Sequence, residues 1–127
     1  KAGRRSRRLV ELIDIYPTLC DLAGLPKPDH LQGQSLVPLL KNPDAKWKPQ
    51  AISRYNSGDT IRTDHFRYTQ YSSGSKVLGQ MLYNHETDPA ENTNIAGQAT
   101  EAKRATNLAK RLQVNMSKSS PRQKKKR

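Results

Sequence analysis

The sequence predicts an α+β fold in which helices near both ends flank a small four-stranded antiparallel sheet. Three observations predict it. Apolar residues recur at helical spacing over residues 15–23 and again over 100–113, and the region between them is rich in β-branched and aromatic residues separated by turn signals. The chain has 127 residues, about one domain, and only 33% of them are hydrophobic, so the expected core is modest.

The first helix is predicted over residues 15–23. Asp14 can cap its first amides, Pro17 falls in the first turn where no intrahelical N–H is required, and Gly24 ends the run. Cys20 is the only cysteine, so an internal disulfide is excluded, and its place within this helix favours a buried small hydrophobe over a nucleophile.

The segments on either side of this helix carry weaker signals. "RLVELI" (8–13) fits a strand or an earlier helical turn that Pro17 would interrupt. Residues 26–50 contain five prolines and predict loops with at most one helical turn at 35–40. We expect Trp47, which lacks a row of neighbouring aromatic residues, to be a partly buried anchor of this loop.

Four strands and a terminal helix are predicted in the second half of the chain. Period-two alternation places Phe66, Tyr68 and Gln70 on one face of a strand and their neighbours on the other. The polar stretch 72–79 predicts a loop with at most a few extended residues, and an apolar stripe predicts an amphipathic helix at the end. The predicted strands are 51–55, 60–63, 66–71 and 80–84, and the helix is 100–113.

The formal net charge of +12 is concentrated at the two ends. Residues 1–8 and 121–127 hold five Lys/Arg each, which leaves residues 9–120 with 13 basic against 11 acidic residues. Blocks of like charge resist burial, so solvated tails are favoured over dedicated binding arms. The alternative is contact of the tails with a polyanion such as nucleic acid or an acidic glycan. No apolar run is long enough to span a membrane.

The stretch "LYNHETDPAEN" (82–92) concentrates acidic residues beside His85. The helical zinc motif H-E-x-x-H fails here, because Pro89 stands where the second His is needed. Asp88, Pro89 and Glu91 therefore favour a turn that leaves a strand, with side chains bonded to backbone amides, over a metal site.

Three ordered motifs resemble the C-terminal part of a type I sulfatase of the alkaline-phosphatase-like superfamily. "LVELIDIYPTLCDLAGLP" with the later "GQSLVPLL", "TIRTDHFRYTQY" and "LYNHETDPAENTN" each resemble a family signature, and the iduronate-2-sulfatase-like subgroup fits best. Met81 and Asn84 stand where acidic residues are usual in the family. The resemblance implies structural signature roles, with no catalytic or metal-binding residue, for Asp14, Pro17, Thr18, Gly24, Arg62, Thr63, Arg67, Tyr68, Tyr83, Asp88, Pro89, Glu91 and Asn94.

In complete relatives the resemblance implies a large α/β domain with a formylglycine, formed from Cys in C-x-P-x-R, and a calcium ion. Cys20 is followed by Asp21-Leu22-Ala23, so it does not match the modified cysteine, and no cofactor is expected in this chain. The partners implied are a missing N-terminal catalytic domain and a sulfated glycan. Complete relatives are typically exported or lysosomal, but the compartment is open for this chain.

Two hypotheses of different class follow. In the first, the chain, which begins at Lys1, is a cut or truncated C-terminal piece of a sulfatase and is inactive alone; in the second, it is a non-catalytic module whose basic tails bind an anionic polymer. The first predicts an exposed apolar patch with some of Leu9, Ile13, Ile15, Leu19 and Leu22. The expected organisation is a basic tail (1–8), a helix and linker completing the catalytic domain (9–49), a sheet subdomain (50–113) and a basic disordered tail (114–127).

Overall fold

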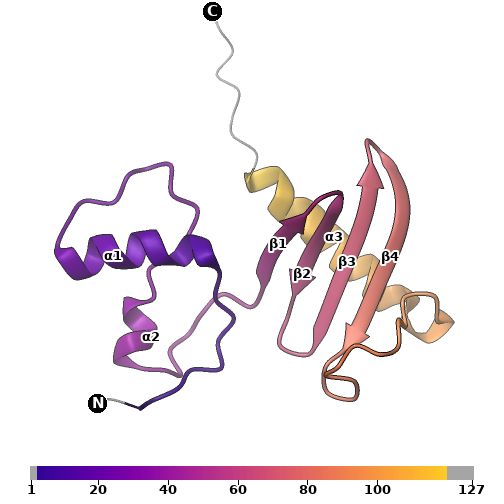
Figure 1. Ribbon diagram of the computed structural model, residues 1–127, viewed down its shortest axis with the longest axis horizontal. Helices are drawn as coiled ribbons and strands as arrows, with labels where there is room; N and C mark the ends of the chain where they lie inside the picture. Colours follow the sequence, from indigo (N-terminus) through magenta and orange to yellow (C-terminus); the bar gives the residue numbers. More distant parts are fainter. Residues whose placement is uncertain (1–2, 120–127) are drawn as a thin grey trace, which may run out of the picture. The chain divides into compact units, whose positions relative to one another are not determined.

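The computed structural model describes residues 3–119. Contacts divide the chain into two compact units, one ending at Ala51 and the other beginning at Ile52. The first contains the helices α1 and α2, and the second contains a four-stranded sheet with helix α3 (Figure 1). Within the described residues, no helix is both long enough and apolar enough to cross a membrane.

The first unit is built around α1, Ile15–Ala23, whose predicted bounds are confirmed. Gly24 adopts the left-handed conformation (φ 66°), and the amide of Leu25 donates to the carbonyl of Cys20 over 2.9 Å, which ends the helix as predicted. Cys20 is buried, also as predicted. Before α1, the chain forms a 3₁₀ turn, Leu12–Asp14, which agrees with the helical alternative for this segment.

The predicted cap at Asp14 is wrong. Asp14 itself has helical backbone angles (φ −75°, ψ −17°) and its side chain makes no cap hydrogen bond to α1. Its carboxylate turns back and accepts the amide of Glu11 over 2.8 Å, as part of a capping box on the 3₁₀ turn. The carboxylate of Asp14, which the sequence predicts as a cap of α1, therefore caps the preceding 3₁₀ turn instead.

The remaining chain of this unit is held by hydrogen bonds to backbone carbonyls. The single helical turn expected at 35–40 is α2, Val37–Lys41. Trp47 is partly buried and its indole N–H donates to the carbonyl of Leu9 over 2.8 Å, so the expected anchoring of the loop is confirmed. Arg4, Ser6 and Arg8 donate side-chain hydrogen bonds to backbone carbonyls of residues 40–44.

The second unit contains an antiparallel sheet of order β1-β2-β3-β4, which confirms the predicted four-stranded meander. The register pairs Arg62 with Arg67 and Arg67 with Tyr83 across the three strands β2, β3 and β4. The strands are β1 Ala51–Tyr55, β2 Gly58–Arg62, β3 Phe66–Ser73 and β4 Lys76–Asn84.

Two predicted boundaries in this unit are corrected. The stretch 72–79 forms a tight hairpin at Gly74 (φ 57°) instead of a loop. Backbone pairing extends β3 to Ser73 and begins β4 at Lys76, although the side chains here are mostly polar. The terminal helix α3 is Ala102–Ser119, so residues 114–119 continue the helix and are not a disordered tail. The predicted tail at 120–127 lies outside the described residues.

Helix α3 covers one face of the sheet and forms the core with it (Figure 1). Ile61, Tyr68 and Leu82, one from each of three neighbouring strands, are fully buried against Leu108 and Leu112. The predicted alternation along β3 is thereby confirmed, because Phe66 and Tyr68 face the helix while the residues between them face away.

Helix α1 keeps an apolar side that no described residue covers. Ile13, Ile15, Leu19 and Leu22 are 51%, 48%, 58% and 62% exposed, so the predicted exposure of these side chains is confirmed, whereas Leu9 is partly buried. Pro17, Thr18 and Cys20 on the opposite side are buried. Apolar side chains exposed on one side of a helix whose other side is buried are typical of a surface that another element covers.

The core of the second unit should be sensitive at Leu82. Leu82→Ala leaves a cavity beneath α3 and should lower the free energy of unfolding by about 3 kcal/mol. The matched control is Leu78→Ala on the same strand, where the side chain is 58% exposed and the expected change is within about 0.5 kcal/mol. Urea denaturation of the 127-residue chain measures both, and equal losses would contradict this description of the core.

Candidate functional site

Asp14 is the centre of the first unit, where its carboxylate is completely buried. The amides of Glu11 and Gln34 each donate to it over 2.8 Å. Lys48 Nζ lies 2.9 Å from Oδ1 and 2.6 Å from Oδ2, and it also contacts Glu11 Oε2 at 2.5 Å. The buried charge is therefore compensated by one cation and two amides drawn from three separate segments.

The signature residue Thr18 and the glycine Gly33 join the same segments. The hydroxyl of Thr18 donates to the carbonyl of Asp14 over 2.5 Å and accepts the amide of Leu36 over 2.8 Å. A Cβ at Gly33 would lie 2.0 Å from the carbonyl oxygen of Ile13, so only glycine fits where this loop crosses the 3₁₀ turn. Pro17 is fully buried beside them. This group of contacts positions the loop, and it contains no arrangement for chemistry.

Asp88 organises the turn after β4. Its carboxylate accepts the amides of Asn92 (3.0 Å) and Thr93 (2.9 Å) and the side-chain amide of Asn92 (3.1 Å). These hydrogen bonds, led by the backbone amides of Asn92 and then Thr93, lower the pKa of Asp88. Pro89 follows on the surface. The oxygens of Asp88 are thus occupied by the loop's own amides.

Asn94 ties the same loop to the outer edge of β4. Its side-chain carbonyl accepts the amides of Leu82 (2.9 Å) and Ala96 (3.1 Å), and its side-chain N–H donates to the carbonyl of Gln80 (3.1 Å). The amide of Ile95 adds a bond to the carbonyl of Leu82 over 2.9 Å. Thr63 stabilises the β2–β3 turn in a similar way, since its hydroxyl oxygen accepts a hydrogen bond from the amide of Phe66.

The sheet face turned away from α3 carries the polar and charged side chains. Arg62 and Arg67 lie directly opposite each other on β2 and β3, and Arg67 stacks on Tyr83 with its guanidinium carbon 5.3 Å from the ring centroid. One row further along, the hydroxyls of Thr60 and Thr69 are 2.8 Å apart. A hollow of about 490 Å³ opens on this face.

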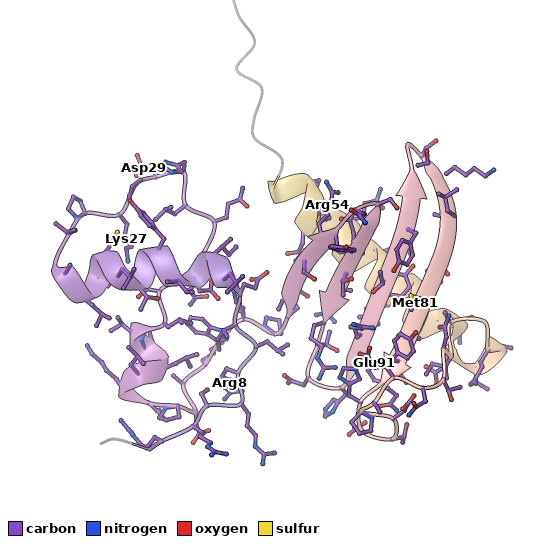
Figure 2. The ribbon with its side chains drawn as sticks, viewed as in Figure 1. Arg8, Lys27, Asp29, Arg54, Met81 and Glu91 are labelled. Carbon is purple, nitrogen blue, oxygen red and sulfur yellow. The ribbon has the colours of Figure 1, made fainter. Side chains whose placement is uncertain are left out.

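Glu91 reaches this face from the loop after β4 (Figure 2). It forms an ion pair with Arg67, and its Oε1 lies 2.5 Å from Nε2 of His85. Its backbone has a positive φ of 59°, an uncommon conformation for a residue other than glycine. Desolvation lowers the pKa of Arg62, with Glu91 opposing and Arg67 adding to this shift.

Seven of the signature residues form two groups, while Thr63, Asp88, Pro89 and Asn94 shape the turn and loop described above. Asp14, Pro17 and Thr18 meet in the first unit, whereas Arg62, Arg67, Tyr83 and Glu91 meet on the open face of the sheet. Gly24 ends α1, and Tyr68 faces the opposite side of the sheet, in the core. Within residues 3–119, no three His, Cys, Asp or Glu side chains are grouped to hold a metal ion.

Sequence reasoning missed Lys48 and Gly33 as partners of the first group and His85 as a partner of Glu91. Gly33 and His85 lie within the quoted motifs and Lys48 lies outside them, but their contacts with these partners form only in the fold. The flanking signal for Lys48 was its place beside Trp47 in an otherwise polar loop, and this signal does not identify an ion pair with Asp14.

Comparison with known proteins identifies the class to which this fold belongs. The α+β unit with its four-stranded antiparallel sheet is the C-terminal subdomain of a sulfatase. The family model described as "N-sulphoglucosamine sulphohydrolase, C-terminal" matches residues 1–118, and the chain belongs to this family.

The chain is similar to two curated sulfatases. It is 38% identical over 109 residues to arylsulfatase K of Homo sapiens, covering 76% of this chain and 20% of that protein. It is 36% identical over 93 residues to delta 4,5-hexuronate-2-O-sulfatase of Bacteroides thetaiotaomicron, covering 66% of this chain and 19% of that protein. The chain therefore spans about a fifth of the length of these relatives.

A solved structure gives the same fold. BT4656, in complex with its substrate D-glucosamine-2-N,6-O-disulfate, superposes with a TM-score of 0.73 at 28% identity. The match covers 89% of this chain and 25% of that one. Most of this chain thus has its counterpart in one quarter of a substrate-bound protein.

Loss of Lys48 should unfold the first unit selectively. Lys48→Met leaves the buried carboxylate of Asp14 without its cation and should lower stability by about 3 kcal/mol. Fluorescence of Trp47, the single tryptophan, reports this unit. The matched control is Lys46→Met, because Lys46 is exposed and should change stability by less than about 0.5 kcal/mol. Equal denaturation midpoints for the two variants would contradict this role.

Asp88 should make stability depend on pH in the acidic range. Its folded-state pKa lies below its unfolded value, near 3.9, so its contribution is complete above that value and is lost as pH falls through the folded-state pKa. Asp88→Asn should therefore reduce stability at neutral pH and flatten the acid limb of the stability profile. Exposed Asp29, replaced by Asn, serves as the control. NMR titration of the Asp88 carboxyl measures the shift directly, and an unshifted value would refute it.

Proposed function

We propose that this chain is the C-terminal subdomain of a sulfatase that hydrolyses sulfate esters of sulfated glycans, and that it is structural, without catalytic activity of its own. In this proposal the formylglycine and the calcium ligands belong to an N-terminal catalytic domain. Residues 9–49 complete that domain, and the sheet subdomain supports one wall of the substrate cleft.

The observation that carries the proposal is the uncovered apolar side of α1. Four of its large apolar side chains are about half exposed or more, although the opposite side of the same helix is buried. Exposure of this kind marks a surface that another element covers. The matched part of the chain is only about a fifth of each of these relatives, which supports a covering domain within the same protein.

Support for glycan substrates comes from the names of similar proteins. One relative is a hexuronate-2-O-sulfatase, and BT4656 binds a disulfated glucosamine. We favour a 2-O-sulfated uronate as the substrate of the complete protein, in agreement with the iduronate-2-sulfatase-like motifs. Hydrolysis of a 2-O-sulfated uronate disaccharide, compared with a 6-O-sulfated glucosamine, distinguishes these two substrate classes.

The alternative is a non-catalytic module that binds an anionic polymer through its basic ends. Helix α3 supports it in part, since residues 102–119 contain five Lys/Arg and no acidic residue. Retention of the 127-residue chain on immobilised heparin that decreases with salt, together with failure of the chimera described next, would favour this alternative.

The proposed function predicts that the chain alone does not turn over an aryl sulfate but supports turnover within a sulfatase. In a chimera, residues 9–119 replace the matching segment of human arylsulfatase K, and activity on an aryl sulfate should be retained. Within this chimera, Leu19→Asp places a charge in the expected domain interface and should abolish soluble, active protein.

The matched control is Val114→Asp in the same chimera, where an exposed residue on α3 receives the same charge and activity should stay within about twofold. Turnover by the 127-residue chain alone would overturn the non-catalytic assignment. Equal activity of the Leu19→Asp and Val114→Asp chimeras would contradict the proposed domain interface at α1.

A further inference from the structure

The open face of the sheet holds two arginines in an arrangement that is unfavourable by itself. Arg62 and Arg67 are direct cross-strand partners on β2 and β3, so their side chains leave the sheet side by side on the same face. Like charges in directly opposite positions destabilise a sheet. Both side chains are partly buried, so water screens their mutual repulsion only in part.

The described residues supply too little negative charge for this pair. Glu91 forms its ion pair with Arg67 and shares its other oxygen with His85. Arg62 forms no ion pair within residues 3–119, and the exposed Asp64 acts on it only weakly from the turn. Two arginines against one carboxylate leave one positive charge uncompensated.

Two buried nitrogen atoms confirm that the arrangement is incomplete. Nη1 of Arg62 and Nε of Arg67 are shielded from solvent, and neither has a hydrogen-bond partner among the described residues. Buried donors are satisfied in the large majority of cases, and an unsatisfied donor on a charged group is especially costly. The two atoms that lack partners belong to the two residues that carry the excess charge.

The surroundings of these arginines suit a small oxyanion. The hollow of about 490 Å³ on this face is lined by both arginines, by the hydroxyl-bearing Thr60 and Thr69, and by His85 and Glu91. Guanidinium groups present fixed pairs of N–H donors that match the two oxygens of a carboxylate or a sulfate. The hydroxyls of Thr60 and Thr69 are hydrogen-bonded to each other over 2.8 Å, so one O–H of the pair is left to donate to an anion.

The geometry points to an anion-binding site on the open face of the sheet, in which Arg62 and Arg67 bind one oxyanion, a carboxylate or a sulfate, beside Glu91. The anion balances the excess positive charge and accepts hydrogen bonds from Nη1 of Arg62 and Nε of Arg67. Its source is either an acidic side chain of the rest of the protein or an acidic group of the glycan. Only this choice of source rests on the proposed function; the site itself is a property of this chain.

Sulfate titration of the 127-residue chain tests the site directly. The probe is sodium sulfate added at constant ionic strength against sodium chloride, and the readout is the NMR signals of the Nε–H groups of Arg62 and Arg67. We expect saturable shifts of both signals. Arg62→Gln should raise the apparent Kd for sulfate about tenfold, since it removes charge-assisted hydrogen bonds.

The matched control is Arg54→Gln, which removes a cation from the same sheet, where Arg54 is exposed and paired with Asp59. Its apparent Kd for sulfate should stay within about twofold of the parent value. A second variant, Glu91→Gln, removes the competing carboxylate and should tighten sulfate binding, a direction that simple loss of structure would not produce. Unsaturable shifts, or equal Kd values for the parent chain and Arg62→Gln, would overturn the site.

The source of the anion is determined in the chimera with arylsulfatase K. If an acidic side chain of the catalytic domain fills the site, Arg62→Gln lowers the chimera's melting temperature and leaves KM unchanged. If the glycan fills it, Arg62→Gln raises KM for a sulfated disaccharide and leaves KM for an aryl sulfate unchanged. Failure of the chimera itself would count against the proposed function, while sulfate binding by the isolated chain would still support the site.

Discussion

A charge removed from water must be compensated within the fold, and this requirement organises both units of the chain. In the first unit Asp14, completely buried, meets the requirement through two amides and Lys48, which it shares with Glu11, and these partners bring three distant segments together. In the second unit it is met only in part, because Glu91 serves Arg67 and His85 but not Arg62. The difference separates a contact that completes a local structure from one that awaits a group supplied from elsewhere.

The elements that were predicted correctly are those that are determined by residues close together in the sequence. Helix α1 was predicted to the residue because Pro17 and Gly24 punctuate it, and the two faces of β3 followed from period-two alternation. The expected exposure of Ile13, Ile15, Leu19 and Leu22 needed one further argument, which came from the resemblance to sulfatases: a helix that packs against a catalytic domain keeps an apolar side exposed when that domain is not part of the chain.

The elements that did not follow depend on contacts distant in sequence. Asp14 was predicted only as a cap of the following helix, and its bonds to Gln34 and Lys48 depend on segments 20 and 34 residues away. The opposition of Arg62 and Arg67 is a consequence of strand register, which the turn at Thr63 sets and which no composition reveals. The first half of β4 was missed because residues 76–79 have the composition of a polar loop, although Lys76, Val77 and Gly79 pair with β3 on either side of an irregularity in the register. Tertiary pairing outweighed local propensity there.

The contacts of Asn94 have a consequence for association between molecules. An outer strand of a sheet presents free N–H and C=O groups that can pair with a strand of another chain and so begin aggregation. Here the Asn94 side chain and the Ile95 amide occupy the outward groups of Gln80 and Leu82, so a segment of only two residues acts as a short substitute strand. The signature asparagine thereby protects the β4 edge of the sheet against pairing with another chain.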